Sequence, residues 1–321
     1  MTIITSLAKK LFLRLTPAKL RMQLKFNRVN FSAAPPILVF QMGKVGSTSI
    51  LDTLNRMDLG RPIYHAHYLS AEGVRAAKTW HLEQQGKAPH SITYYEVLGS
   101  KLRATCGKVR FTIITGAREP IARDISNYFE LAGRIDRGLR NDDGSFDSGK
   151  IERYFIDRFN RFADEGDHYF GTNWFERELK GTFGIDIYSY PFDQDRGYTV
   201  IREDSFDLLV YQFEKMTDIF PDALAQLLGR DDVPALAKSN VGNSKWYAGL
   251  YADIKDSIVI PADICKRIYQ TKYVKHFYSE EMINRFIEYW SRPRKTYYPG
   301  GSIVGIIFKQ HSGHVPLESS F

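Results

Sequence analysis

A short apolar segment followed directly by a loop rich in glycine and hydroxyl side chains constrains this chain more than any other feature. Residues 37–40 read Ile-Leu-Val-Phe, which has the length and composition of a buried parallel strand. Residues 41–46 contain two glycines, and a helix is expected from Ser47 to Met57. Strand, tight turn and helix in this order predict an anion-binding site, because backbone N–H groups at the start of a helix attract negative charge.

The side chains of this loop suit a phosphate group. Lys44 adds a mobile positive charge, and three consecutive hydroxyl residues follow Gly46. A plain tight turn with Lys44 in solvent is the alternative. The order differs from the ordinary nucleoside-triphosphatase loop, in which the lysine comes directly after the second glycine. The candidate phosphate-binding residues are Gly43, Lys44, Val45, Gly46, Ser47, Thr48 and Ser49.

Predicted strands and helices alternate along the rest of the chain. Further strands are expected at 62–69, 109–115, 185–190, 197–202, 207–213 and 302–308. Helices are expected over 71–106 with a break near Gly86 and Pro89, from Pro120, over 151–164 and 172–181, and through most of the last third. The stretch 134–150 is expected to be an exposed loop. The alternation predicts one α/β domain over 35–308, with a central, mainly parallel sheet flanked by helices, and a polar tail over 309–321.

Positive charge is concentrated at the N-terminus. The chain has 44 Lys and Arg against 37 Asp and Glu, and residues 1–34 contain seven of the basic residues and no acidic one. The remainder is therefore neutral, which argues against a nucleic-acid-binding domain. Apolar residues at helical spacing between Ile4 and Leu15 predict a basic amphipathic helix that ends at Pro17. This segment can pack on its own domain, lie on an anionic membrane surface through residues 1–30, or be a cleaved targeting segment.

Two features of the sequence indicate where in the cell the protein is located. Cys106 and Cys265 are the only cysteines, and two such distant thiols favour a reducing environment over a disulfide framework. No window approaches about 18 consecutive apolar residues, as a membrane-spanning helix would require. We therefore expect a cytoplasmic protein, located at the inner face of the membrane if the N-terminal helix binds lipid.

A second motif follows the strand expected at 109–115. Residues 118–128 read Arg-Glu-Pro-Ile-Ala-Arg-Asp-Ile-Ser-Asn-Tyr. An arginine at the end of a strand and a serine in the following helix can both reach one phosphate, so Arg118 and Ser126 are candidate ligands. The alternative is a surface charge at an exposed helix start. Together, the order Lys-x-Gly-Ser-Thr in the loop and the pattern Arg-x-Pro-x-x-Arg-x-x-Ser-x-Tyr resemble the phosphate-binding motifs of sulfotransferases that use 3′-phosphoadenosine-5′-phosphosulfate (PAPS).

Two later segments resemble a narrower family. Residues 242–247 (Gly-Asn-Ser-Lys-Trp-Tyr) and 275–279 (Lys-His-Phe-Tyr-Ser) are similar to a bacterial family of capsular polysaccharide synthesis proteins, which is itself sulfotransferase-like. The resemblance implies the P-loop sulfotransferase fold, PAPS as donor, adenosine 3′,5′-bisphosphate as product, and no metal. It also implies that Lys44 stabilises the bridging oxygen, that Arg118 and Ser126 hold the 3′-phosphate, and that Lys245 contacts the nucleotide. Alternatively, the aromatic residues beside Lys245 belong to the core.

A histidine pair is the candidate for the catalytic base. His65 and His67 lie two residues apart on the strand expected at 62–69, so they share one face near its carboxyl end, where open α/β sheets bind ligands. A neutral imidazole can take the proton of an attacking hydroxyl. The segment also resembles the His-x-His of heparan sulfate 2-O-sulfotransferases, which implies His67 as base and His65 as its helper. A structural pair, a metal site, and a glutamate base at Glu119 or Glu96 are the alternatives.

The resemblance implies transfer of a sulfuryl group from PAPS to a hydroxyl acceptor, which in the resembling families is usually a sugar hydroxyl of a polysaccharide or glycan. Two other classes of function stay open. A P-loop kinase or nucleoside triphosphatase would use ATP and Mg²⁺. A non-catalytic protein of envelope polysaccharide assembly would bind nucleotide or glycan without turnover.

Overall fold

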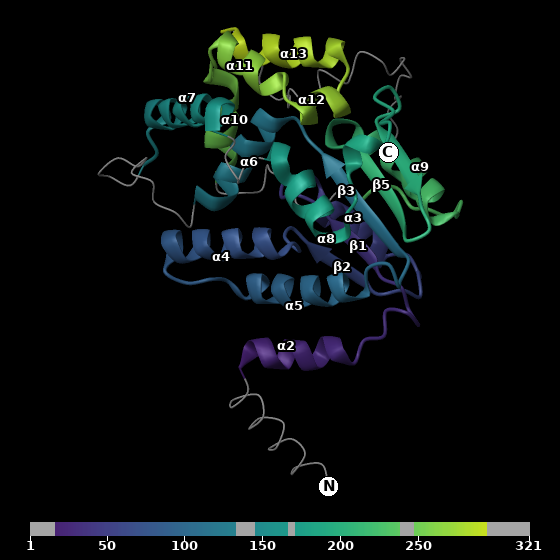
Figure 1. Cartoon of the computed structure of the whole chain (residues 1–321). Coiled ribbons are helices and arrows are strands. Elements are labelled where there is room, and N and C mark those ends of the chain that lie inside the picture. Colours follow the sequence, from purple (N-terminus) through teal and green to yellow (C-terminus); the bar gives the residue numbers. More distant parts are fainter. Residues whose placement is uncertain (1–16, 133–144, 166–170, 238–246, 294–321) are drawn as a thin grey trace, which may run out of the picture.

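The structure is a computed structural model that describes residues 17–132, 145–165, 171–237 and 247–293 (Figure 1). Within these ranges one five-stranded sheet has the order β2-β1-β3-β5-β4. Its strands are β1 (Ile37–Phe40), β2 (Ile63–Ala66), β3 (Phe111–Ala117), β4 (Tyr198–Arg202) and β5 (Phe206–Gln212). All neighbouring pairs are parallel except β4 and β5. The α/β class and the mainly parallel sheet expected from the sequence are confirmed.

Helices surround this sheet (Figure 1). The α-helices are α2 (Ala18–Asn27), α3 (Ser47–Asn55), α4 (Ala71–Gln85), α5 (His90–Thr105), α6 (Pro120–Ala132), α7 (Ser148–Glu165), α8 (Gly181–Phe183), α9 (Met216–Leu228), α10 (Ala248–Ser257), α11 (Ala262–Tyr269), α12 (Lys272–Phe277) and α13 (Glu280–Ser291). Three 3₁₀ turns, η1 (Gly171–Asn173), η3 (Ile187–Ser189) and η4 (Phe213–Lys215), and a π-helix, η2 (Phe175–Lys180), complete the described elements.

Alternate side chains of the central strands pack into two separate hydrophobic cores, one on each face of the sheet. Ile37 and Val39 of β1 pack in a core with the apolar faces of α3 and α9. Leu38 and Phe40 point to the opposite side, into a larger core that includes α5, α6 and the C-terminal helices. Both faces of the sheet are therefore covered, which explains why β1 is apolar along its whole length.

Several element boundaries differ from the sequence expectation. The prediction of a strand at 185–190 is wrong, because a 3₁₀ turn, η3, occupies this stretch. The carboxylate of Asp186 accepts a hydrogen bond from Tyr188 N at 3.1 Å and so starts this turn. The helix expected over 172–181 is split into η1, η2 and α8. Helix α7 begins inside the expected 134–150 loop, where Asp147 Oδ1 accepts from Lys150 N at 2.9 Å. The break near Gly86 and Pro89 separates α4 from α5 as expected.

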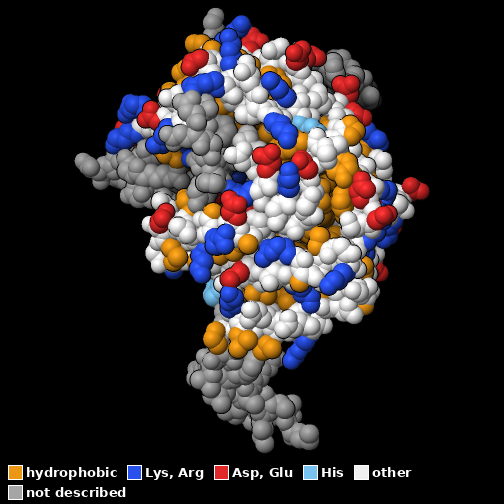
Figure 2. Space-filling model, viewed as in Figure 1, with side chains coloured by type: hydrophobic (Ala, Val, Ile, Leu, Met, Phe, Trp, Pro, Cys, Tyr) orange, Lys and Arg blue, Asp and Glu red, His pale blue; other side chains and the backbone are white. Residues whose placement is uncertain are grey.

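The first described helix, α2, packs along α5 with one face and leaves another in solvent. Phe26 is buried, and Lys101 of α5 donates to its main-chain oxygen. Leu20 and Leu24 are 45% and 39% exposed, and apolar side chains are visible at this end of the molecule (Figure 2). Residues 1–16, which carry the expected amphipathic stripe, lie outside the described residues, as do 302–308 and the tail. In the described part of the chain, none of the helices combines the length and apolar character needed to cross a bilayer.

Candidate functional site

The three sequence motifs meet at one edge of the sheet. Strands β2, β1 and β3 are adjacent and parallel, so the loops that follow them emerge side by side. The glycine loop (residues 41–46) follows β1, His67 follows β2, and Arg118 follows β3. This carboxyl edge is where open α/β sheets place their ligands.

The glycine loop has an unusual backbone that its neighbours hold in place. Lys44 and Gly46 have φ values of 73° and 88°, so both adopt the left-handed conformation. That conformation costs roughly 1–2 kcal/mol for a residue with a Cβ atom. Tyr211 Oη lies 2.9 Å from Gln41 Oε1 and 2.5 Å from Val45 O, which anchors both sides of the turn. Ser47 and Ser49 at the start of α3 are partly exposed, and Thr48 is exposed.

Two arginines from the second motif also fix the loop. Arg118 Nη1 donates to Lys44 O at 2.6 Å, and its guanidinium carbon lies 4.3 Å from the ring centre of Phe213. Arg123 Nε donates to Gly43 O at 3.2 Å. Arg118 is only 7% exposed, so the interpretation of this residue as a surface charge is wrong. The loop and the arginine motif, which are about 75 residues apart in the chain, form one structural unit.

The candidate cation of the loop is paired in this structure. Lys44 Nζ lies 3.1 Å from Glu130 Oε2, and Tyr247 Oη donates to the same oxygen at 3.0 Å. Ser126 lies one helical turn before Glu130 on α6 and is partly exposed. Lys44 and Ser126 therefore border the same region. Lys245, the other expected nucleotide contact, lies outside the described residues. Tyr247 is buried and packs on Phe129, in agreement with the core interpretation for that position.

The two histidines lie against each other. Their ring centres are 4.5 Å apart in an edge-to-face arrangement, so the shared face expected from the sequence is confirmed. His67 Nδ1 lies 2.8 Å from Gln41 O. A carbonyl oxygen only accepts hydrogen bonds, so Nδ1 carries the proton and Nε2 keeps its lone pair. His67 thus has the tautomer that a general base requires at Nε2.

Burial keeps both rings neutral. The pKa of His67 is lowered chiefly by burial, while the hydrogen bond to Gln41 opposes this shift and the charges of Arg123 and Lys44 add to it. Burial, together with the adjacent His67, lowers the pKa of His65 to about 3. Both are therefore uncharged near neutral pH. Among the described residues, no group of three or more His, Cys, Asp or Glu side chains is arranged to hold a metal ion.

The two alternative carboxylate bases occupy other places. Glu119 is buried and caps the start of α6, accepting from Ile121 N at 2.8 Å and from Ala122 N at 2.7 Å. Tyr269 Oη donates to the same carboxylate at 2.5 Å. Glu96 pairs with Lys19 of α2 on the surface of α5. A pocket lies beside His67, and neither Glu119 nor Glu96 is among the residues that line it.

The loop that carries His67 is held by two residues that were not predicted from the sequence to belong to the site. Trp174 Nε1 donates to His67 O at 2.9 Å. Glu178, which is fully buried in the π-helix η2, accepts from Leu69 N at 2.9 Å and from Ser70 N at 3.0 Å. π-Helical turns occur frequently at functional sites. The segment around η2 therefore positions the candidate base, although it lies more than 100 residues away in the chain.

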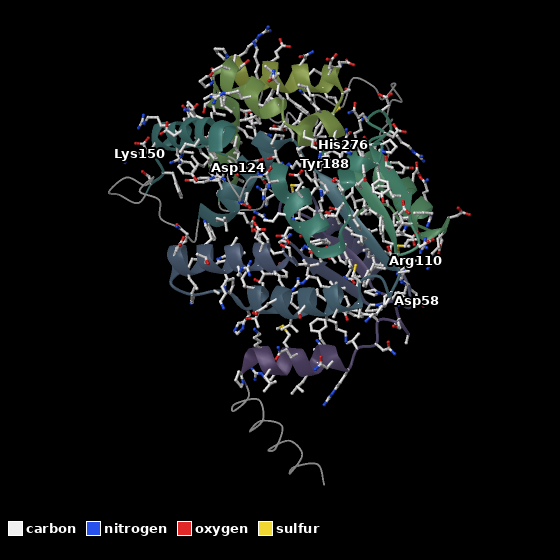
Figure 3. The ribbon with its side chains drawn as sticks, viewed as in Figure 1. Asp58, Arg110, Asp124, Lys150, Tyr188 and His276 are labelled. Carbon is white, nitrogen blue, oxygen red and sulfur yellow. The ribbon has the colours of Figure 1, made fainter. Side chains whose placement is uncertain are left out.

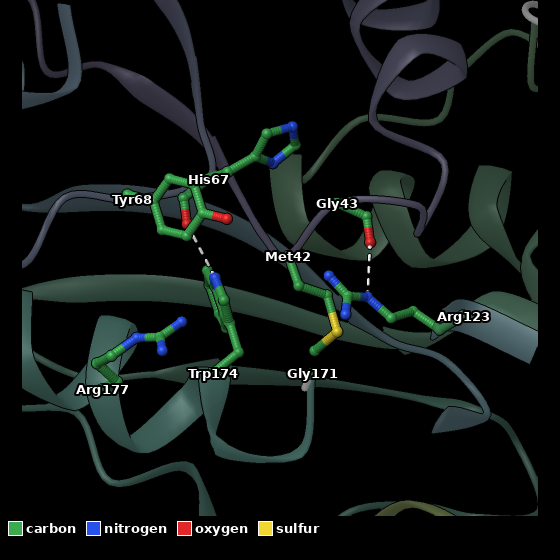
Figure 4. A pocket seen from close by; sticks show the side chains of 8 residues that line it. All are labelled: Met42, Gly43, His67, Tyr68, Arg123, Gly171, Trp174 and Arg177. Atoms are coloured by element: carbon green, nitrogen blue, oxygen red, sulfur yellow. Dashed lines mark hydrogen bonds between the residues drawn. The ribbon is translucent and has the colours of Figure 1, made fainter. Parts of the chain in front are cut away.

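A pocket opens next to His67 (Figure 4). It is lined by Met42, Gly43, His67, Tyr68, Arg123, Gly171, Trp174 and Arg177. The first four come from the loops after β1 and β2, and the last three come from the segment around η1 and η2. Of the residues predicted as ligands or base, the pocket contains Gly43 and His67. Arg123 belongs to the second motif, but its place in this pocket had no signal in the sequence.

One stretch in the second half of the chain matches a family model. Residues 168–279 match the model of the NKWYS family, described as "Putative capsular polysaccharide synthesis protein". The resemblance expected from residues 242–247 and 275–279 is confirmed over that stretch, which includes η2 and the pocket residues Trp174 and Arg177. The description names no reaction. None of the curated proteins matches the chain significantly.

Proposed function

We propose that this protein is a PAPS-dependent sulfotransferase that transfers a sulfuryl group to a hydroxyl of a glycan in capsular polysaccharide synthesis. The observation that carries the proposal is the meeting of three groups at one sheet edge: a phosphate-type loop after β1, Arg118 after β3, and a neutral imidazole after β2. The match of residues 168–279 to the capsular polysaccharide family supports a role in glycan metabolism.

The described residues fit a nucleotide with phosphates at its 3′ and 5′ positions. The amides that begin α3 suit the 5′-phosphate, because they lack partners within the helix and the helix dipole favours an anion there. Arg118 and Ser126 suit the 3′-phosphate. Lys44 Nζ would leave Glu130 to meet the donor, since a phosphate bears more negative charge than a carboxylate.

The donor supplies a sulfuryl group joined to a phosphate leaving group. His67 Nε2 takes the proton of the acceptor hydroxyl while the hydroxyl oxygen forms its bond to sulfur. Lys44 stabilises the negative charge that develops on the bridging oxygen as its bond to sulfur breaks. The products are the sulfate ester and adenosine 3′,5′-bisphosphate, and the proton remains on His67 until solvent removes it. Positioning and electrostatic stabilisation thus account for the chemistry.

Thermal stabilisation by adenosine 3′,5′-bisphosphate, compared with ATP and Mg²⁺, tests the proposal. A ligand at 100 times its Kd adds about 2.7 kcal/mol, which corresponds to a rise in Tm of roughly 4 °C for a chain of this length. A rise with the bisphosphate that needs no metal and disappears in Lys44→Ala is the expected result. A rise only with ATP and Mg²⁺ would instead favour the kinase or triphosphatase, and no rise with either would overturn nucleotide binding at this loop.

A non-catalytic binding protein predicts a different combination. Such a protein would bind the bisphosphate and a glycan but release no product from PAPS, and His67→Ala would leave both affinities unchanged. The tautomer of His67 and its place at the pocket favour the enzyme, because a binding protein has no need for a neutral base there. Product release from PAPS in the presence of glycan acceptors separates the two functions.

A further inference from the structure

The residue that follows β3 is held by a tyrosine from the C-terminal helices. β3 ends at Ala117 and α6 begins at Pro120, so Arg118 lies in the junction between the two elements. Its main-chain N–H donates to Tyr273 Oη at 2.8 Å, and the same hydroxyl donates to Arg118 O at 2.8 Å. One side chain therefore satisfies both backbone polar groups of this residue.

Tyr273 itself is fixed by aromatic packing. It is 2% exposed and lies on α12, and its ring packs on Phe277 of the same helix and on Phe175 of η2, with ring centres 5.2 and 6.1 Å away. His276 of α12 packs edge-to-face on Tyr188 of η3 with ring centres 5.2 Å apart, and Figure 3 labels both residues. Aromatic contacts with η2 and with η3 thus keep α12, and the hydroxyl that it carries, in place.

The side chain of Arg118 extends from this junction to the glycine loop. Its Nη1 donates to Lys44 O at 2.6 Å, and its guanidinium carbon lies 4.3 Å from the ring centre of Phe213. In the same junction, Glu119 N donates to Glu214 Oε1 at 2.7 Å, and Glu214 directly follows Phe213 in the chain. A guanidinium group recognises phosphate through planar donors in a fixed geometry, so its orientation depends on the main chain from which it extends.

From this arrangement we infer that Tyr273 is a positioning residue of the donor site: by holding the main chain of Arg118, it orients the guanidinium toward the 3′-phosphate. The inference rests on the proposed function, because it names a further residue needed to recognise the same donor. It also connects the family match to the donor site. Tyr273 and Phe175 lie within the matched stretch 168–279, whereas both phosphate motifs lie before it.

Removal of the hydroxyl alone tests the inference. Tyr273→Phe keeps the ring that packs on Phe175, which in turn packs on Trp174 beside His67. Calorimetric titration of the full chain with adenosine 3′,5′-bisphosphate and with adenosine 5′-phosphate gives the preference for the 3′-phosphate as the ratio of the two Kd values. Tyr273→Phe should lower this preference about fivefold, as expected for one net hydrogen bond. The affinity for adenosine 5′-phosphate should change little.

A double-mutant cycle with Arg118→Ala separates positioning from general destabilisation. The two hydrogen bonds of Tyr273 Oη involve only main-chain atoms of Arg118, so they can form in Arg118→Ala as well. Loss of the hydroxyl should therefore lower Tm equally in both backgrounds. It should lower the preference for the 3′-phosphate only in the background that has the guanidinium group.

Tyr269→Phe is the matched control. Tyr269 is buried and its Oη donates to Glu119 Oε1 at 2.5 Å, but that carboxylate also accepts from Ile121 N and Ala122 N. This variant should lower Tm and keep the preference for the 3′-phosphate. 4-Aminophenylalanine in place of Tyr273 keeps a hydrogen-bonding group of similar size and should retain part of the preference. It replaces Tyr273→Phe in the comparison if loss of the hydroxyl prevents folding.

Two results would overturn the inference: a preference that Tyr273→Phe leaves unchanged although Tm falls, and an equal fall of the preference in the Arg118→Ala background. The proposed function has a separate readout in the unaltered protein. Failure of that protein to bind the bisphosphate would contradict the donor site and the inference together. Binding of the bisphosphate with a preference that does not respond to Tyr273→Phe would contradict only the positioning role.

Discussion

His67 Nδ1 lies 2.8 Å from the main-chain oxygen of Gln41, so the residue after β1 determines which nitrogen of the imidazole after β2 carries the proton. Gln41 also begins the glycine loop, and its side chain is held by Tyr211. The orientation of the candidate base and the shape of the candidate phosphate loop therefore depend on the same residue. Because Phe40 and Ala66 are paired in the sheet, this relationship follows from the register of β1 and β2.

Replacement of His67 by alanine should lower kcat by about 100-fold or more, the range expected for a lost general base, with little change in the affinity for adenosine 3′,5′-bisphosphate. Release of the bisphosphate from PAPS, with glycan acceptors and with water alone, measures the rate. His90→Ala is the control, because His90 is exposed at the start of α5. A rate equal to that of the unaltered protein would place the base elsewhere.

The lowered pKa values of His65 and His67 predict how stability depends on pH. Both histidines are neutral when folded but bind a proton near pH 6.5 when unfolded, so the unfolded state takes up protons first as the pH falls. Stability should be complete above about pH 6.5 and should decline toward pH 3. Each buried histidine contributes up to about 1.4 kcal/mol per pH unit. Denaturant unfolding across this range should show a shallower decline in His65→Phe, and a parallel decline would contradict the assignment.

Substitutions of Lys44 and of Glu130 should have opposite effects on nucleotide binding. Lys44→Ala should remove turnover and weaken the bisphosphate complex, whereas Glu130→Gln should strengthen it, because the lysine no longer has to leave a carboxylate 3.1 Å away. A change of about tenfold or less is expected for Glu130→Gln, since a partly exposed ion pair contributes little. Lys180→Ala is the control, as Lys180 pairs with Asp186 on the surface. Weaker binding in Glu130→Gln would assign that glutamate a role in holding the site together.

The site residues that could be predicted from the sequence are those that belong to a motif of a few consecutive positions. The run at 37–40, the glycines after it and the arginine motif each occupy a few consecutive positions, and the sheet order brings them together as expected. The pocket wall formed by Trp174 and Arg177 had no such pattern. Trp174 contacts His67 across 107 positions, and η2 differs from the regular helix expected there. Contacts of this kind depend on packing between distant segments, which composition and periodicity do not encode.

Gly46 should be more sensitive to alanine than another glycine with a similar backbone. A Cβ atom at Gly46 would lie 2.5 Å from Met216 Sδ, whereas one at Gly60 would meet nothing within 4 Å, although both glycines have positive φ. Gly60→Ala should cost about 1 kcal/mol from backbone strain alone. Gly46→Ala should lower the free energy of unfolding by at least about 1 kcal/mol more than Gly60→Ala does, because Met216 must move. Equal losses in urea unfolding would show that α9 does not pack tightly on the loop.

Arg118 should discriminate between nucleotides with and without a 3′-phosphate. Arg118→Lys retains the charge but not the hydrogen bond to Lys44 O in its present geometry, and Arg118→Ala removes both. We expect Arg118→Ala to weaken the binding of adenosine 3′,5′-bisphosphate by about tenfold or more, and to weaken the binding of adenosine 5′-phosphate much less. Calorimetric titration with both nucleotides measures the difference. An equal loss for the two would indicate that Arg118 only shapes the loop.

The outer face of α2 should promote binding to an anionic membrane surface. Leu20 and Leu24 are exposed one turn apart, and Lys25 is exposed on the same helix. Together with the absence of acidic residues from positions 1–34, this arrangement suits a surface of anionic lipid. The full chain should sediment with vesicles that contain phosphatidylglycerol, more weakly at high salt and little with phosphatidylcholine alone.

The double variant Leu20→Ser, Leu24→Ser should reduce this vesicle binding by about tenfold, because the helix then inserts less apolar surface. Leu82→Ser is the matched control, since Leu82 is 45% exposed on α4, as Leu20 is on α2. Unchanged Tm values should confirm that both variants keep the contact between α2 and α5, which depends on Phe26 rather than on the exposed leucines. If the double variant and Leu82→Ser bind vesicles equally well, the exposed face of α2 serves another purpose than lipid contact.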